Sequence, residues 1–193
     1  MIAAATSPNN NFMTSAILLL TQLSFQAPSA APAIDNQRVQ VRQLDGAADS
    51  VPYDSAWVSR TGHATFLKKG DKHAADGPGI LIGLKDFKVE PLVNKTGLPA
   101  AFPRPGSKKL LENARVVVWD YTWTPGVATP MHFHDKDVVV YYLDDGDLQS
   151  TTPSGEKTVN PYKPGMIRFN LRDRSHTETL IRGKQHGIMT ELK

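Results

Sequence analysis

The sequence predicts an all-β fold, built as an antiparallel sandwich or barrel. Short stretches of alternating or continuous apolar residues recur along the chain, and such stretches are typical of strands. The chain holds 14 glycines and 14 prolines, which predict frequent turns between these stretches. We find no convincing amphipathic helix and no internal repeat. Many short strands joined by turns favour a sandwich or barrel over a helix bundle.

Composition excludes several classes of function. A chain of 193 residues suits one domain, or one domain with an extension. The absence of cysteine excludes disulfides, cysteine-based zinc sites, iron–sulfur clusters and thiol nucleophiles. The net charge of +3 comes with no basic run, so no nucleic-acid partner is expected. Neither a glycine-rich phosphate loop before a helix nor a Gly-x-Ser-x-Gly elbow is present.

Residues 1–33 differ from the rest of the chain because they contain no charged side chain. The apolar run at 16–20 is too short for a membrane span but matches the apolar part of a signal peptide. The small residues Ala31 and Ala33 then predict cleavage after Ala33 and a periplasmic or secreted protein. No Lys or Arg precedes the run, so a disordered leader on a cytoplasmic protein is the alternative.

Residues 34–111 are expected to form an N-terminal extension with additional strands. The alternation over 38–44 predicts a strand, and Trp57 and Val58 mark a buried point. Further strands are predicted over 63–68, 80–84 and 87–89, with a loop over 69–79. The segment 94–109 carries three prolines, which favour an extended connection outside the centre of a sheet.

Residues 112–193 hold the strongest strand pattern. In the strand predicted over 115–123, the odd positions form an apolar and aromatic face that we interpret as core packing. The continuous apolar run over 138–143 is typical of a strand covered on both sides. The remaining predicted strands are 148–152 and 157–159, which form a hairpin around Pro153-Ser154-Gly155, followed by 166–171, 177–181 and 187–192.

The histidines are the main candidates for chemistry. His132 and His134 flank Phe133, and in a strand residues two apart point to the same face. A His-x-His pair therefore presents two imidazoles to one metal ion, although the same pattern also occurs by chance on surfaces. His63 and His73 lie in turn-rich stretches and are expected to face solvent.

The surroundings of this pair resemble the cupin family. The first cupin motif runs Gly-x5-His-x-His, then three or four residues, Glu, six residues and Gly. This chain has Gly126, five residues, His132-x-His134, four residues, Val139, six residues and Gly146.

The second motif is matched more loosely. Pro164-Gly165 is followed by a predicted strand and by His176, at a longer spacing than usual. The resemblance covers about residues 112–193 and does not assign the region before it.

The resemblance implies a double-stranded β-helix, or jelly-roll barrel, in which His132, His134 and His176 bind one divalent metal ion. Iron is favoured, with zinc, nickel or copper as alternatives. Val139 stands where the family has its glutamate, so Asp137 becomes a candidate fourth ligand, unless it caps the adjacent turn. Three protein ligands would leave coordination positions open, as in catalytic sites. A cupin that has lost its metal is the alternative interpretation.

The activity implied by three-histidine cupins is oxidation of a small molecule with dioxygen. A metal-binding or ligand-binding cupin without turnover, or a metal-dependent isomerase or lyase, is the alternative. An isomerase or lyase needs a general base, for which Asp137, Glu178 and Tyr142 are weak candidates. Family resemblance also implies a homodimer, and the strand at 38–44 is a candidate for pairing between subunits.

Three residues are candidates for a substrate pocket. Arg168 would hold an anionic group if it faced inward, but an outward orientation is slightly favoured. Tyr142 lies in the buried strand, and His186 in the last strand is either near the site or structural. The sequence leaves the substrate open.

Overall fold

The computed structural model describes residue 1 and residues 31–46, 50–73 and 77–193. The predicted leader therefore lies almost entirely outside the described residues. Among the described residues, no helix is long and apolar enough to cross a membrane.

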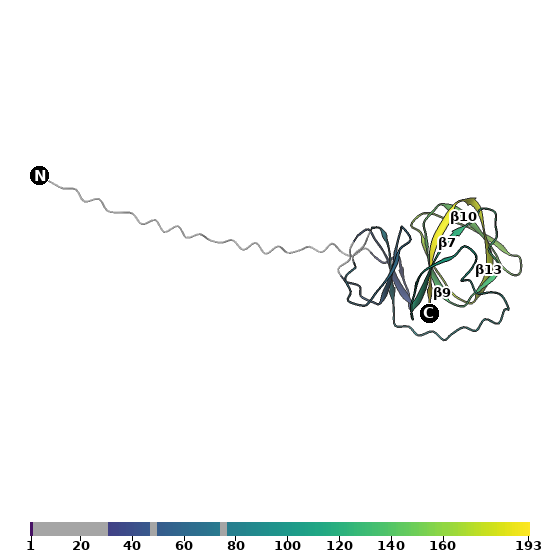
Figure 1. The fold of residues 1–193 in the computed structure, drawn as a ribbon, viewed down its shortest axis with the longest axis horizontal. Coiled ribbons are helices and arrows are strands. Elements are labelled where there is room, and N and C mark those ends of the chain that lie inside the picture. Colours follow the sequence, from purple (N-terminus) through teal and green to yellow (C-terminus); the bar gives the residue numbers. More distant parts are fainter. Residues whose placement is uncertain (2–30, 47–49, 74–76) are drawn as a thin grey trace.

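Every regular element of the described chain is a strand, and the strands form three antiparallel sheets (Figure 1). The all-β expectation is confirmed. The strands are β1 (Ile34–Asp35), β2 (Val39–Leu44), β3 (Ser55–Ser59), β4 (Ala64–Leu67), β5 (Gly79–Leu84), β6 (Lys108–Glu112), β7 (Val116–Trp123), β8 (His132–His134), β9 (Asp137–Tyr142), β10 (Gly146–Thr151), β11 (Lys157–Tyr162), β12 (Ile167–Asn170), β13 (Arg174–Gly183) and β14 (Gln185–Leu192).

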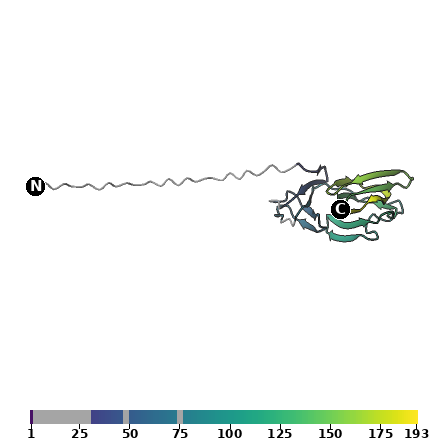
Figure 2. The same ribbon diagram turned by 90° about the horizontal axis from the view of Figure 1, so that it is seen from above.

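The three sheets lie in layers. The middle layer has the order β12-β9-β14-β7-β6, and with the sheet β11-β10-β13-β8 it forms the jelly-roll barrel. The N-terminal sheet, β1-β2-β5-β3-β4, covers the outer face of the middle layer. Figure 2 shows this sheet at one end of the molecule and the barrel at the other. The middle sheet is therefore shared between two cores.

Alternation along the middle strands explains how one sheet serves both cores. On β9, Val139 and Tyr141 pack in the core beneath the N-terminal sheet, whereas Val138, Val140 and Tyr142 pack inside the barrel. All six residues of β9 are buried, because successive side chains point to opposite faces and both faces are covered. The same alternation places the odd positions of β7 inside the barrel, as the sequence predicts.

Two local expectations are wrong. Residues 87–89 form no strand; the Phe87 amide instead donates to the Lys85 carbonyl oxygen in a tight turn, and the Phe87 side chain is exposed. His73 is buried rather than solvated, and its ring lies 4.1 Å from that of Trp57. His63 is exposed, as expected. The division at residues 111 and 112 stays a prediction and falls at the end of β6.

A buried ion pair ties the N-terminal sheet to the barrel. Arg38, next to β2, donates from Nη1 to Asp137 Oδ2 on β9 over 2.7 Å, and the two side chains are 11% and 6% exposed. The second carboxylate oxygen, Oδ1, accepts from the Arg172 backbone amide over 2.8 Å. Both oxygens of Asp137 are therefore used in holding layers and loops together.

We predict that Asp137→Ala lowers the free energy of unfolding by about 3–5 kcal/mol, because it leaves the Arg38 guanidinium buried without its counter-charge. Urea denaturation measures the loss. The double variant Arg38→Met with Asp137→Leu is the control and should be much closer to wild type, since it removes both charges. Equal losses in the single and double variants would contradict this role.

Glu191 is a second buried carboxylate whose environment affects stability. Its Oε2 accepts from Trp119 Nε1 over 2.8 Å inside the barrel. Burial raises the pKa of Glu191 above its usual 4.5, and the Trp119 N–H offsets this only in part. The folded state therefore binds this proton more tightly than the unfolded state, so stability falls as the pH rises from below 4.5 through the folded pKa.

We predict that Glu191→Gln stabilises the protein at pH 7, because the amide oxygen still accepts from Trp119 and no charge is buried. The gain over wild type should shrink as the pH falls through the folded pKa towards 4.5, below which the glutamate is protonated in both states. Denaturation midpoints at pH 7 and pH 4 test this. A difference that does not change with pH would be inconsistent with a raised pKa.

Candidate metal centre

The site begins with the short strand β8, which consists of His132, Phe133 and His134. The two imidazoles point to one side because residues two apart share a face. β8 pairs antiparallel with β13, in a register that sets His176 opposite His132. Residues paired across two strands project their side chains to the same side of the sheet. The register therefore brings the third imidazole to the other two.

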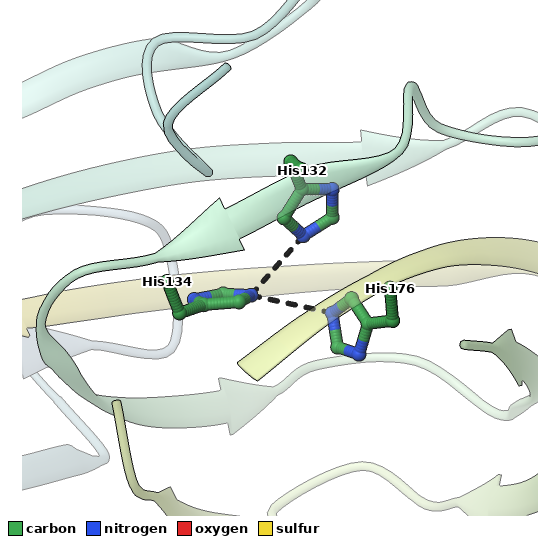
Figure 3. Close-up of side chains that lie close together, drawn as sticks. All are labelled: His132, His134 and His176. Carbon is green, nitrogen blue, oxygen red and sulfur yellow. Dashed lines mark hydrogen bonds between the residues drawn. The ribbon is translucent and has the colours of Figure 1, made fainter. Parts of the chain in front are cut away.

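The three rings meet through their Nε2 atoms (Figure 3). His134 Nε2 lies 3.1 Å from His132 Nε2 and 3.2 Å from His176 Nε2. The planes of the rings are inclined to one another by 66° to 85°, so the rings converge edge-on instead of stacking. All three residues are buried.

The opposite ring nitrogens help to orient the Nε2 atoms. His132 Nδ1 lies 2.8 Å from the Pro130 carbonyl oxygen, which can only accept a hydrogen bond. The proton of neutral His132 therefore sits on Nδ1, and Nε2 keeps a lone pair. His176 Nδ1 lies 3.2 Å from the Ser150 hydroxyl, which can accept or donate, and 3.3 Å from Arg174 Nη1, which can only donate. Such partners commonly orient histidines that bind metal. His134 Nδ1 has no hydrogen-bond partner among the described residues.

Burial keeps the imidazoles neutral. It lowers the pKa of all three histidines, that of His176 to about 4, and the positive charges of Arg174 and Arg104 add to the effect. At neutral pH each ring therefore offers an uncharged nitrogen, which is the form that binds a metal.

The donor set fits a divalent ion. Tetrahedral metal–nitrogen bonds of about 2.0–2.1 Å put the ligand atoms roughly 3.3 Å apart, close to the distances from His134 Nε2 to the other two Nε2 atoms. Three lone pairs facing one another repel unless a proton or a cation lies between them. Imidazole donors suit zinc, copper, iron and nickel better than magnesium or calcium.

Glu178 supplies a carboxylate beside the histidines. It follows His176 by two positions on β13 and faces the same side, with Oε1 4.0 Å from His176 Nε2. Oε2 accepts from Trp123 Nε1 over 3.2 Å and lies 3.6 Å from Arg104 Nη1. Burial alone would raise the pKa of Glu178, but the charges led by that of Arg104 lower it, so the carboxylate is ionised.

Asp137 is not placed as a fourth ligand, which corrects that expectation. It is not among the three residues whose ligand atoms come together. Its carboxylate instead binds Arg38 and the Arg172 amide at the junction with the N-terminal sheet. The sequence offered no way to see this, because Arg38 is 99 positions away.

A polar cavity of about 170 Å³ adjoins the histidines. Tyr142 and Arg168 both line it, so the outward orientation favoured for Arg168 is wrong: its exposed side chain stands where the cavity opens. The lining residues are Tyr142, Leu148, Ser150, Asn160, Tyr162, Arg168, Asn170, Arg174, His176 and Glu178.

His186 does not reach this cavity, contrary to its candidacy for the substrate pocket. On β14, Met189 packs inside the barrel, whereas Ile188 packs beneath the N-terminal sheet. His186 shares the side of Ile188 because strand side chains alternate. There its Nε2 lies 2.7 Å from Asp120 Oδ1, so its role is structural.

Two arginines of the site were missed at the sequence level. Arg174 precedes His176 by two positions, and strand alternation from His176 would have found it. Arg104 comes from the proline-rich connection before β6, and its guanidinium lies 4.0 Å from the ring centre of Tyr121. No periodic signal marks Arg104, since it belongs to no strand.

Comparison with known proteins finds a curated relative that matches along nearly its whole length. The β-alanine degradation protein BauB of Pseudomonas aeruginosa is 32% identical over 101 residues, which cover 51% of this chain and 99% of BauB. A scan against models of protein families finds no match.

Solved structures of cupins are also similar to this chain. A cupin domain from Bordetella pertussis is 25% identical over 48% of this chain and 99% of its own, with a TM-score of 0.42. A cupin 2 conserved barrel domain protein from Leptotrichia buccalis is 12% identical over 83% of this chain and 86% of its own, with a TM-score of 0.44.

The barrel brings the His-x-His pair and the third histidine of the cupin motifs to one point, and the match to BauB covers 99% of that relative. The chain belongs to the cupin family.

Proposed function

We propose that the protein binds one divalent metal ion through His132, His134 and His176 and uses it to oxidise a small molecule with dioxygen. The observation behind this proposal is the convergence of three neutral Nε2 atoms beside a polar cavity. Iron is the ion we propose: oxidation with dioxygen needs a redox-active metal, which excludes zinc, and the resemblance to three-histidine cupins favours iron over copper and nickel. An ion held there would supply electrons to dioxygen and Lewis acidity to the substrate.

The residues around the cavity prepare the site for a small substrate. Burial in the barrel excludes bulk water from the histidines. Burial also raises the pKa of Tyr142 well above its usual value, so its hydroxyl stays protonated and can donate a hydrogen bond. The name of BauB refers to degradation of β-alanine, which supports a small-molecule substrate in this family branch.

A metal-dependent isomerase or lyase is the second candidate, and Glu178 favours it. An ionised carboxylate 4.0 Å from His176 Nε2 is close enough to accept a proton from a molecule held near the histidines, after a small movement. A cupin that holds a metal or ligand without turnover is the third candidate.

Our first prediction for this site concerns metal retention. His132→Ala and His176→Ala should each reduce bound metal from about one ion per chain to near zero, because two imidazoles hold an ion far more weakly than three. Elemental analysis after purification without chelators measures it. His63→Ala is the matched control, since His63 is exposed and outside the group, and it should keep its metal. Equal retention in all variants would refute the assignment.

The second prediction separates the candidate activities. Protein with stoichiometric iron should consume dioxygen when small-molecule candidates are added, measured with an oxygen electrode. His134→Ala should not. Full metal loading with no oxygen uptake, but with isomerised or cleaved product, would shift the assignment to an isomerase or lyase. No metal at all would identify a cupin that has lost its ion.

Export and dimerisation remain proposals from the sequence. If the leader is a signal peptide, the amino terminus of the protein recovered from cells should be Ile34, as read by mass spectrometry. Light scattering should give twice the chain mass if subunits pair. In the described chain, β1 covers only Gln40 and Val41 of β2, so much of this strand's edge is open to pairing. A monomer that still carries the uncleaved leader would contradict both proposals.

A further inference from the structure

The interior beside the histidines carries an excess of positive charge. Arg104, Arg168 and Arg174 line the cavity and the adjoining wall, and Glu178 is the only carboxylate among the lining residues. Three arginines against one glutamate leave a net charge of +2. A divalent ion held by three neutral imidazoles would add two more, because no carboxylate belongs to the group of described residues whose ligand atoms come together.

Among the described residues, Arg174 has no carboxylate in direct contact, although the charge of Glu178 acts on it from a distance. It is partly buried on β13, and no carboxylate of the described chain forms an ion pair with it. Its Nε donates to the Leu171 carbonyl oxygen over 2.9 Å, and Nη1 lies 3.3 Å from His176 Nδ1. Glu178 is already used by Arg104 and Trp123. A buried charge without a counter-charge costs free energy, so this position favours an anion from outside.

Arg168 places a second cation where the cavity opens. It comes from β12, the neighbour of β9, and its guanidinium lies 5.9 Å from the ring centre of Tyr162. An incoming anion therefore passes one arginine at the mouth and meets another inside. The side chain of Arg168 is exposed, so a ligand can reach it.

The cavity also limits the size and shape of the anion. About 170 Å³ holds a molecule of only a few heavy atoms, well below the size of drug-like ligands. Leu148 and the stacked rings of Tyr142 and Tyr162, whose centres lie 3.8 Å apart, supply the apolar part of this otherwise polar lining, which a short carbon chain can contact. A guanidinium fork matches the two oxygens of a carboxylate.

We propose that the cavity binds a small monocarboxylate, with its carboxylate on Arg174 and Arg168 and its carbon chain along Leu148, Tyr142 and Tyr162, next to the three histidines. This inference rests on the proposed function and specifies the substrate class of that site. The apolar side chains beside the arginines favour a monocarboxylate over phosphate, because phosphate has no carbon chain to contact them.

Calorimetric titration of the zinc-loaded full chain tests the proposal, since zinc is redox-silent and allows no oxidation. The probes are propionate, the neutral propionamide, the cationic propylamine and inorganic phosphate. Propionate should bind at least tenfold more tightly than each of the other three. Tighter binding of propylamine, propionamide or phosphate would overturn the assignment.

Variants identify the groups responsible. Arg174→Gln should weaken propionate binding at least tenfold while zinc content stays at wild-type level, and Arg168→Gln should weaken it several-fold. Arg182→Gln is the matched control on the same strand; Arg182 is exposed, pairs with Asp145 and Asp147, and should not affect binding. If Arg174→Gln does not fold, Arg168→Gln decides, because its side chain is exposed. Unchanged propionate affinity in the folded variants would overturn the proposal.

The metal-free protein separates this inference from the proposed function. If wild type retains no zinc, the metal function fails, but the arginines remain. Propionate should then still bind, more weakly, and Arg174→Gln should still reduce that binding. Zinc retention without any propionate binding would leave the metal site intact and refute only the carboxylate site.

Discussion

The antiparallel pairing of β8 with β13 is the interaction on which the candidate site depends. It sets His132 opposite His176 and Arg174 opposite His134, so ligands and charges from two distant segments share one face. A slip of one residue would turn every side chain of β8 to the other side of its sheet. The burial that keeps the imidazoles neutral, and the position of Glu178 next to them, both follow from this register.

The middle sheet, packed between two layers, supports the sheet that contains β8 and β13. The middle sheet is buried on both faces, so β9 and β14 have little freedom to move and hold the barrel wall in place. The ion pair between Arg38 and Asp137 fastens the N-terminal sheet to β9 near the end of the barrel that carries β8. Sites built on strands of a packed scaffold keep their geometry better than sites on loops. The N-terminal extension therefore stabilises the barrel without contributing to the histidine cluster.

The charges around the cavity belong to arginines and one glutamate, not to the histidines. Burial makes the imidazoles neutral, and the side-chain charges of Arg104, Arg174 and Glu178 act on them. Arg104 lies on Tyr121 and faces Glu178, and it fixes the carboxylate in its ionised form. Arg174 has no such carboxylate partner among the described residues. Its positive charge therefore favours a negatively charged group on a molecule that enters the cavity.

The sequence by itself determined the strand pattern of the barrel, the apolar face of β7, the burial of β9 on both sides, and the three histidines, because apolar patterning and the cupin motif spacing are local properties. Only the tertiary structure decided that Asp137 binds Arg38, that Arg168 borders the cavity, that His186 turns away from it, and that Arg104 reaches Glu178. Each of these depends on contacts between segments far apart in the chain. Local periodicity says which face a side chain takes along its own strand, but not which distant element covers that face.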